Sequence, residues 1–128
     1  VDTSGSMNAS QMNKALSTVV ELGKVYPDFE LVLIQFDTDI TQVDEYQRHT
    51  APTEFKDFKW RGRGGTAYKP LFAKLSKYNP EVVIVVSDGY VSDSDWNLDL
   101  HVWPVIWLIT SEVSIPNNIK KHSVVLFL

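Results

Sequence analysis

Hydrophobic positions recur at helical spacing in two segments of the chain. The first set predicts an amphipathic helix over residues 8–25, with Asn8 as its N-cap and Pro27 beyond its end. The second set predicts a helix over residues 67–78, and Pro70 stands in its first turn, where a missing N–H costs little. The apolar positions are Met12, Ala15, Leu16, Val19, Leu22 and Tyr26 in the first helix, and Leu71, Phe72, Leu75 and Tyr78 in the second.

Shorter runs of apolar and β-branched residues predict strands. One of them, residues 40–47, alternates more strongly between apolar and polar positions, which favours a place near a sheet edge. Strands that alternate with helices predict an α/β fold, with a doubly wound, mostly parallel sheet and helices on both faces. Residues 50–65 are expected to form a long polar connection, and residues 89–99 a loop or short helix. The predicted strands are residues 30–36, 40–47, 81–86, 102–109 and 123–128.

The composition is that of an ordinary soluble globular protein. The chain has 128 residues, 44% hydrophobic and 22% charged, which suits a single domain over residues 1–128. The formal net charge of -4 argues against nucleic acid or an anionic membrane as a partner, since both favour a basic face. The absence of cysteine excludes disulfides and cysteine-based zinc sites. With no signal peptide and no transmembrane run in the sequence, we expect a cytoplasmic protein.

Polar residues suited to binding a metal follow the predicted strands. In the stretch DTSGS, Asp2, Ser4 and Ser6 alternate, so a turn can direct all three oxygens toward one point. Thr66 follows two glycines ahead of the second helix, and Asp88 follows the most apolar strand. Ligands of parallel sheets bind beyond the carboxyl ends of the strands, and hydroxyl and carboxylate oxygens suit a hard cation such as Mg²⁺. Each segment alone also fits a structural interpretation, in which these side chains cap local turns.

Together, these segments resemble the metal-ion-dependent adhesion site of von Willebrand factor A (VWA) domains. The chain is similar over essentially its whole length to the bacterial and phage VWA-like family that is often attached to a metallopeptidase-like N-terminal region. The resemblance implies a Rossmann-like fold in which the hydroxyls of Ser4, Ser6 and Thr66 bind Mg²⁺ or Mn²⁺, with Asp2 and Asp88 nearby, directly or through water. The segments that carry it are VDTSGSM (residues 1–7), RGRGGTAYKPLF (61–72), VSDGY (86–90) and PVIWLIT (104–110).

The start of the chain departs from the family pattern. Members carry an apolar strand ahead of the DxSxS motif, whereas only Val1 precedes Asp2 in this sequence. We therefore expect the first strand to be truncated and the chain to be the C-terminal part of a longer protein.

Other polar residues are given simpler interpretations. Asp37 and Asp39 follow a strand at the same sheet edge, where they could support the site, although solvated loop acids are preferred. Asp93 and Asp95 form a DxD pattern, but we prefer loop acids, with Asp95 capping a turn before Trp96. The remaining candidates are Arg61 and Arg63, which either face an acidic partner or lie in a solvated loop, and His49, His101 and His122, whose spacing matches no zinc motif.

Three functions remain open from the sequence. The preferred one is a protein-interaction module, whose bound cation keeps an open position for an Asp or Glu of a partner. By family analogy, that partner could be a MoxR-type AAA ATPase. The alternative is a Mg²⁺-dependent hydrolase or phosphoryl-transfer enzyme that uses Asp2 and Asp88. A third possibility is a scaffold domain that binds no metal at this position.

Overall fold

The computed structural model of the protein describes residues 1–55 and 58–128. Residues 56–57, which fall within the predicted connection 50–65, lie outside the described part of the chain. In chain order, the elements are α1 (Ala9–Gly23), β1 (Glu30–Phe36), β2 (Ile40–Gln47), α2 (Lys69–Leu75), β3 (Val83–Ser87), the 3-10 helix η1 (Asp93–Trp96), β4 (Val105–Ile109), α3 (Asn117–His122) and β5 (Val124–Phe127).

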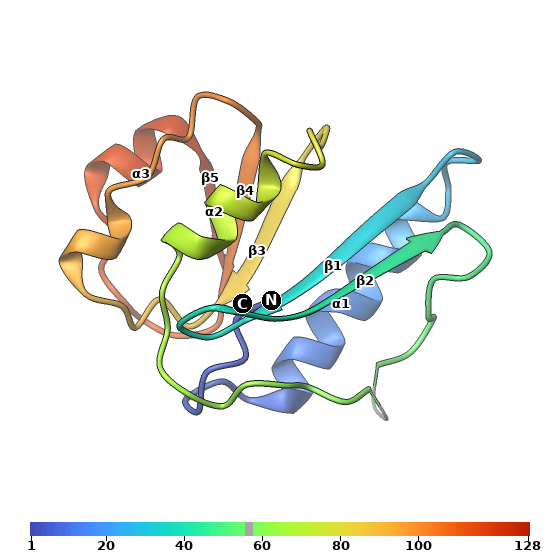
Figure 1. Ribbon diagram of the computed structural model, residues 1–128, viewed down its shortest axis with the longest axis horizontal. Helices are drawn as coiled ribbons and strands as arrows, with labels where there is room; N and C mark the ends of the chain where they lie inside the picture. Colours follow the sequence, from blue (N-terminus) through green and yellow to red (C-terminus); the bar gives the residue numbers. More distant parts are fainter. Residues whose placement is uncertain (56–57) are drawn as a thin grey trace.

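The described strands form two sheets, which are shown in Figure 1. Strands β3, β4 and β5 form a parallel sheet in that order, whereas β1 and β2 form an antiparallel pair. The connection between β1 and β2 has only three residues, which allows a hairpin but not the long crossover that parallel strands require. The mixed α/β fold and its parallel sheet are therefore as predicted, while β1 and β2 form an antiparallel addition to it.

The first residues of the chain connect the two sheets. The backbone N–H of Asp2 donates to the carbonyl of Val86 on β3 at 2.8 Å. The backbone N–H of Thr3 donates to the carbonyl of Phe36 on β1 at 2.7 Å. Phe36 in turn donates its N–H to the carbonyl of Val1 at 3.0 Å, and Asp2 and Phe36 form an isolated parallel bridge. The segment that carries the DxSxS motif is thereby fixed between β1 and β3.

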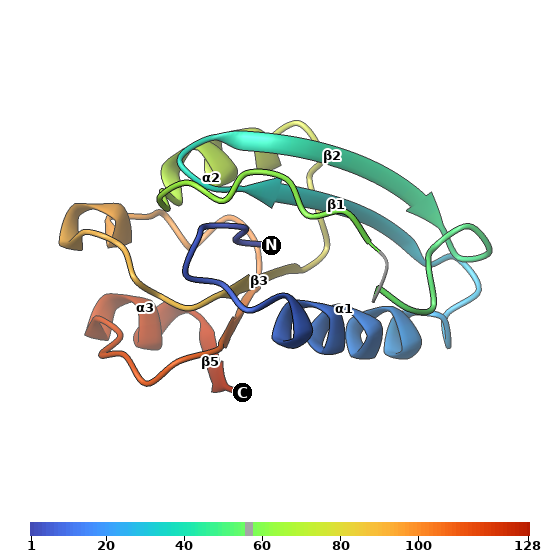
Figure 2. The ribbon, with the colours of Figure 1, turned by 90° about the horizontal axis from the view of Figure 1, so that it is seen from below.

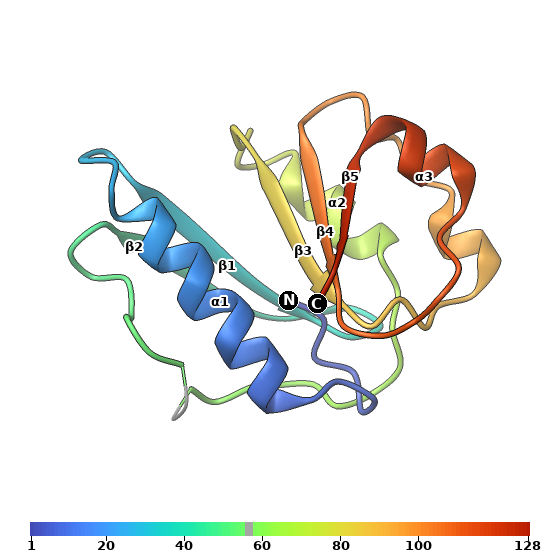
Figure 3. The same cartoon turned by 180° about the vertical axis from the view of Figure 1, so that it is seen from behind.

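Helices cover both faces of the strands. Helix α1 packs its buried Met12, Leu16 and Val20 on one face, in a cluster that includes Leu33 of β1 and Val86 of β3. Helix α2 lies on the other side of the strands (Figure 2 and Figure 3). The cluster on this side contains the aromatic residues Tyr68, Trp96 and Trp107, and α3 contributes Ile119 to it. Its buried members are Ile34, Phe36, Tyr68, Leu71, Leu75, Val83, Val85, Trp96, Leu100, Val105, Trp107, Ile109, Ile115 and Ile119.

Most of the predicted elements are present with shifted ends. Helix α2 begins two residues later than predicted because the backbone N–H of Ala67 donates to the carbonyl of Asp37, which ties the chain to the hairpin before the helix starts. Strand β4 begins at Val105 because Val102, in the bend before Pro104, is 58% exposed and outside the sheet. Helix α3 was not predicted: it has only six residues, and the periodic signal of so short an element is weak.

The long connection after β2 differs from its predicted polar character. Ala51 and Phe55 are 4% and 1% exposed, and both belong to the cluster under α1. The indole N–H of Trp60 donates to the side chain of Asn13 on α1 at 2.9 Å. The described parts of this connection therefore cover α1 with apolar and aromatic side chains.

No helix among the described residues combines the length and apolar character needed to cross a bilayer.

We expect Asn8→Ala to destabilise the protein through the start of α1. The Asn8 side chain accepts hydrogen bonds from the backbone N–H groups of Ser10 and Gln11, at 2.8 and 3.3 Å. Loss of such a cap typically costs about 1 kcal/mol of unfolding free energy, measurable as a lower urea midpoint with an unchanged slope. Asn117→Ala is the matched control, because α3 has no side-chain cap and Asn117 is exposed. Equal midpoints for the two variants would contradict the cap.

Candidate functional site

Three connections converge at the carboxyl ends of β1 and β3. The first is the segment from Asp2 to Ser6, which is held between the two sheets. The second leads into α2 and carries Thr66, and the third follows β3 and carries Asp88. The structure thus brings together the five predicted metal-site residues, Asp2, Ser4, Ser6, Thr66 and Asp88, from segments up to 86 positions apart in the chain.

Hydrogen bonds join these five residues in one network. Asp2 Oδ1 accepts the backbone N–H of Ser4 at 2.9 Å and the hydroxyl of Thr66 at 3.4 Å. The hydroxyls of Ser4 and Ser6 lie 3.3 Å apart. Ser6 donates to Asp88 Oδ2, and Asp88 Oδ1 accepts the backbone N–H of Tyr90 at 3.1 Å. Each carboxylate is therefore held by one backbone donor and at least one hydroxyl donor.

The direction of these bonds determines which atoms are left to bind a ligand. A hydroxyl has one proton and two lone pairs. Thr66 gives its proton to Asp2, and Ser6 gives its proton to Asp88, so both oxygens keep lone pairs for a further partner. An arrangement of hydroxyl lone pairs backed by two carboxylates is suited to a cation with hard oxygen ligands. It is poorly suited to an anion, which would meet both negative charges.

Burial places the two carboxylates and Ser4 away from solvent, and Ser6 and Thr66 nearer to it. Asp2 is 0% and Asp88 3% exposed, whereas Ser6 is exposed and Thr66 half-buried. Burial raises the pKa of the Asp2 carboxyl, hydrogen bonds from Ser87 and Ser4 oppose that rise, and the nearby charge of Asp88 adds to it. A cation at this position would favour the ionised form of Asp2, because opposite charge lowers the pKa of an acid.

Two residues next to the network were not predicted. Ser87, the last residue of β3, donates its hydroxyl proton to Asp2 Oδ2 at 2.6 Å. The hydroxyl of Tyr68, directly before α2, lies 2.8 Å from Ser87 Oγ. Burial raises the pKa of the Tyr68 phenol, which therefore stays protonated. Ser87 lies in the motif VSDGY and Tyr68 in the motif GGTAY. Nothing in the spacing of the two motifs indicates that these residues meet behind Asp2.

The loop that precedes Thr66 is fastened to the DxSxS segment. The backbone N–H of Arg63 donates to the backbone carbonyl of Thr3 at 2.8 Å. The backbone N–H of Gly5 donates to the backbone carbonyl of Gly64 at 2.9 Å. The Arg63 guanidinium donates to the carbonyls of Met7 and Gly5, at 3.2 to 3.3 Å. Arg63 has a φ of 68°, a value that costs energy in a residue other than glycine and is often found at functional sites. Arg63 thus holds the loop before Thr66 against the DxSxS segment, a structural role that the sequence did not predict.

Glycine is required at one position of this loop. Gly62 has a φ of 122°, and a Cβ there would lie 2.6 Å from the hydroxyl oxygen of Thr3. Asp37 lies on the same side and accepts the backbone N–H of Gly64 at 3.2 Å. Asp37 therefore supports the loop that precedes Thr66. Asp39 is exposed, and its carboxylate accepts the backbone N–H of the next residue, Ile40.

The other sequence candidates lie outside this network. Asp95 is part of η1 and accepts the hydroxyl of Ser92 at 2.5 Å, and Asp93 is exposed. His101 and His122 form an edge contact with ring centroids 4.3 Å apart on the surface. In residues 1–55 and 58–128, no group of three or more His, Cys, Asp and Glu side chains is placed to hold a metal ion. The five-residue network contains only two acidic side chains, Asp2 and Asp88, and its other side-chain oxygens belong to hydroxyls.

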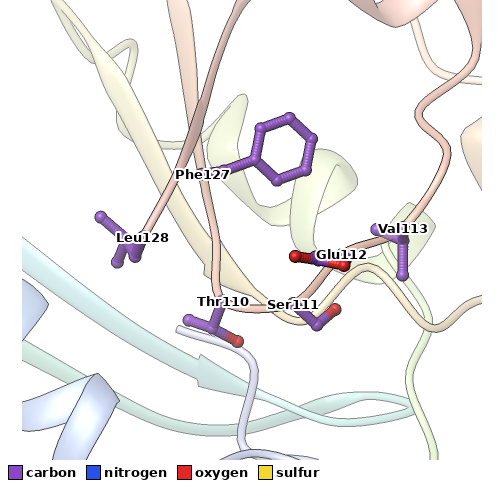
Figure 4. Close-up of a pocket in the computed structure, with 6 residues that line it drawn as sticks. All are labelled: Thr110, Ser111, Glu112, Val113, Phe127 and Leu128. Carbon is purple, nitrogen blue, oxygen red and sulfur yellow. The ribbon is translucent and has the colours of Figure 1, made fainter.

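Figure 4 shows the residues that line a shallow pocket of about 470 Å³. Its lining comes from the loop after β4 and from the end of β5, where Phe127 and Leu128 are 54% and 60% exposed. Ser111 lines the pocket and donates its hydroxyl to the backbone carbonyl of Asp88 at 2.5 Å. Apolar surface is therefore found close to the polar site.

Comparison with protein families identifies a match over most of the chain. A family model described as VWA-like domain (DUF2201) matches residues 1–121 of the 128. This match confirms the resemblance indicated by the sequence motifs. The curated proteins and the solved structures yield no match to the chain.

Without metal, we expect Asp2 to make the protein less stable as the pH rises. Because the pKa of Asp2 is raised from 3.8 in the folded protein, folding takes up a proton. The contribution of this group to unfolding free energy is thus most favourable below 3.8 and is lost as the pH rises through the raised pKa. Urea unfolding between pH about 4 and about 7 in chelated buffer measures it.

Asp2→Asn removes this titration, so the free-energy difference between variant and wild type should shift in favour of the variant toward pH 7. Asp93→Asn, at an exposed position, is the control and should track the wild type. If the difference between Asp2→Asn and wild type is independent of pH, the raised pKa is wrong.

Proposed function

Because the chain belongs to the VWA-like domain family, we propose that it is a metal-ion-dependent protein-interaction module. The cation is Mg²⁺ or Mn²⁺, held by Asp2, Ser4, Ser6, Thr66 and Asp88. The observation that carries the proposal is the hydrogen-bond network that unites these five side chains from three separate segments. Family membership supports the interaction role, and the oxygen-rich network supports the metal.

Each part of the set has a separate role in this proposal. Ser4, Ser6 and Thr66 supply neutral hydroxyl oxygens. The carboxylates of Asp2 and Asp88 orient the hydroxyls of Thr66 and Ser6, and they balance the charge of the cation. Neutral ligands leave a divalent cation electrophilic. A bound Mg²⁺ supplies a positive charge with an open position, which an Asp or Glu of a partner can occupy.

The charge of the site makes partner binding depend on the cation. Without metal, an acidic partner would approach two carboxylates, and like charges in a partly buried site repel strongly. With a divalent cation present, the same position attracts an acid. Chelation is therefore expected to abolish binding of an acidic partner, and by family analogy a MoxR-type AAA ATPase is a candidate for that partner.

The proposal extends to the topology of the fold. Helices α1 and α2 contribute to clusters on opposite faces, and residues 1–3 lie between β1 and β3. Both features support a doubly wound sheet in which the DxSxS segment occupies a central position. Such a position places a ligand at the carboxyl ends of the strands, where α/β folds bind their ligands.

The main alternative is a Mg²⁺-dependent hydrolase or phosphoryl-transfer enzyme at the same position. The observation in its favour is the proximity of Asp2 and Asp88, since paired carboxylates with a metal can support such reactions. Against it, Asp2 is fully buried, and both of its oxygens accept hydrogen bonds from protein donors. A carboxylate held in this way is a poor general base for a substrate.

We expect millimolar Mg²⁺ or Mn²⁺ to raise the thermal midpoint of the protein relative to EDTA. A ligand at about 100 times its Kd stabilises the folded state by about 2.7 kcal/mol. For a domain of this size, that corresponds to a shift on the order of 5–10 °C. Calorimetry or dye-based unfolding measures the shift, and Asp2→Ala should abolish it.

Asp93→Ala serves as the control for this experiment, because Asp93 is exposed and outside the network. It should retain the full shift. A wild-type midpoint that is the same in EDTA and in Mg²⁺ or Mn²⁺ would falsify the metal site. Mg²⁺-dependent phosphatase activity that is lost in Asp2→Asn would instead favour the enzymatic alternative.

A further inference from the structure

We propose that Tyr68 and Ser87 are positioning residues for the metal site, forming a one-way hydrogen-bond relay from Tyr68 through Ser87 to Asp2 that holds the Asp2 carboxylate for cation binding. This inference rests on the proposed function, since the relay acts on a residue of the proposed site. The relay joins three segments: Tyr68 directly precedes α2, Ser87 ends β3, and Asp2 lies between the sheets.

The contacts around Ser87 determine the direction of the relay. The Ser87 hydroxyl has one proton and two lone pairs. The backbone N–H of Gly89 can only donate, and it points at Ser87 Oγ from 3.2 Å. An ionised Asp2 can only accept, and its Oδ2 lies 2.6 Å from Ser87 Oγ. The single proton of Ser87 therefore goes to Asp2, and Tyr68, at 2.8 Å, must donate to the remaining lone pair.

The relay leaves the Asp2 carboxylate one accessible orientation. Its Oδ2 is taken by Ser87, while Oδ1 faces Ser4 and Thr66, on the side of the proposed ligands. Rotation of the carboxylate would break the short bond to Ser87 and leave a buried oxygen without a donor. Hydrogen bonds to a charged group are the stronger ones, and donors in series polarise one another.

Packing fixes Tyr68 at the start of the relay. Tyr68 is fully buried, and its ring contacts those of Phe36, Trp96 and Trp107, with centroids 4.9 to 6.0 Å apart. These contacts belong to the ring alone, so Tyr68→Phe removes the donor and keeps the aromatic packing. The hydroxyl of a buried tyrosine normally has a partner, and here the partner leads to the site.

The test is the Kd of Mn²⁺ for the purified protein and its variants, measured by titration calorimetry or by the paramagnetic signal of free Mn²⁺. Ser87→Ala is expected to raise the Kd by about 10-fold or more, the usual effect of losing a residue that orients a metal ligand. Tyr68→Phe should raise it by a smaller factor. Tyr78→Phe, which alters a tyrosine packed against the same core, should leave it unchanged.

The double variant separates a relay from two independent effects. Because Tyr68 acts only through Ser87, Tyr68→Phe should have no further effect on the Kd in the Ser87→Ala background. Equal factors in the two backgrounds, or a Kd of Tyr68→Phe equal to that of the wild type, would contradict the relay. Unfolding in EDTA is measured in parallel, because a purely structural role would lower stability without changing the Kd.

Two further outcomes keep the test decisive. If the wild type binds no Mn²⁺, the proposed function fails, and the relay with it. If the wild type binds and Ser87→Ala does not fold, the comparison of Tyr68→Phe with Tyr78→Phe still decides the question, since both variants lose only a hydroxyl. Equal Kd values for those two variants overturn the relay alone.

Discussion

Asp2 lies fully buried where the β1–β2 pair meets the parallel sheet, and both its backbone and its side chain are engaged there. A buried carboxylate is tolerated only when donors replace the water that it has lost. Ser4, Thr66 and Ser87 supply those donors from three different segments. The need to satisfy one charge thus fixes the positions of the loops that form the site.

Under the proposed function, the same constraint would link stability to cation binding. Burial raises the pKa of the Asp2 carboxyl, and the charge of Asp88 adds to that rise. A divalent cation would oppose that rise. Under the proposed function, a site that is unfavourable without the cation and favourable with it would suit a module whose interactions depend on metal.

The sequence predicts much of this site because the relevant residues lie in short local patterns. The alternating oxygens of Asp2, Ser4 and Ser6 are visible as a motif, and Asp88 follows an unmistakable apolar strand. Parallel-sheet geometry then predicts that they meet. What local patterns miss are long-range contacts: the Tyr68 hydroxyl behind Asp2, the hydrogen bonds of Arg63 with its positive φ, and the burial of Phe55 under α1. Each depends on how a loop folds back, which no periodicity encodes.

Crystals of the protein soaked in Mn²⁺ would reveal whether the five-residue network holds a divalent cation. We expect a single strong anomalous peak within contact of the Ser4, Ser6 and Thr66 hydroxyls, and loss of that peak in crystals of Asp2→Ala. A well-ordered site in soaked wild-type crystals with no peak there, or a peak that survives Asp2→Ala, would contradict the proposed cation site.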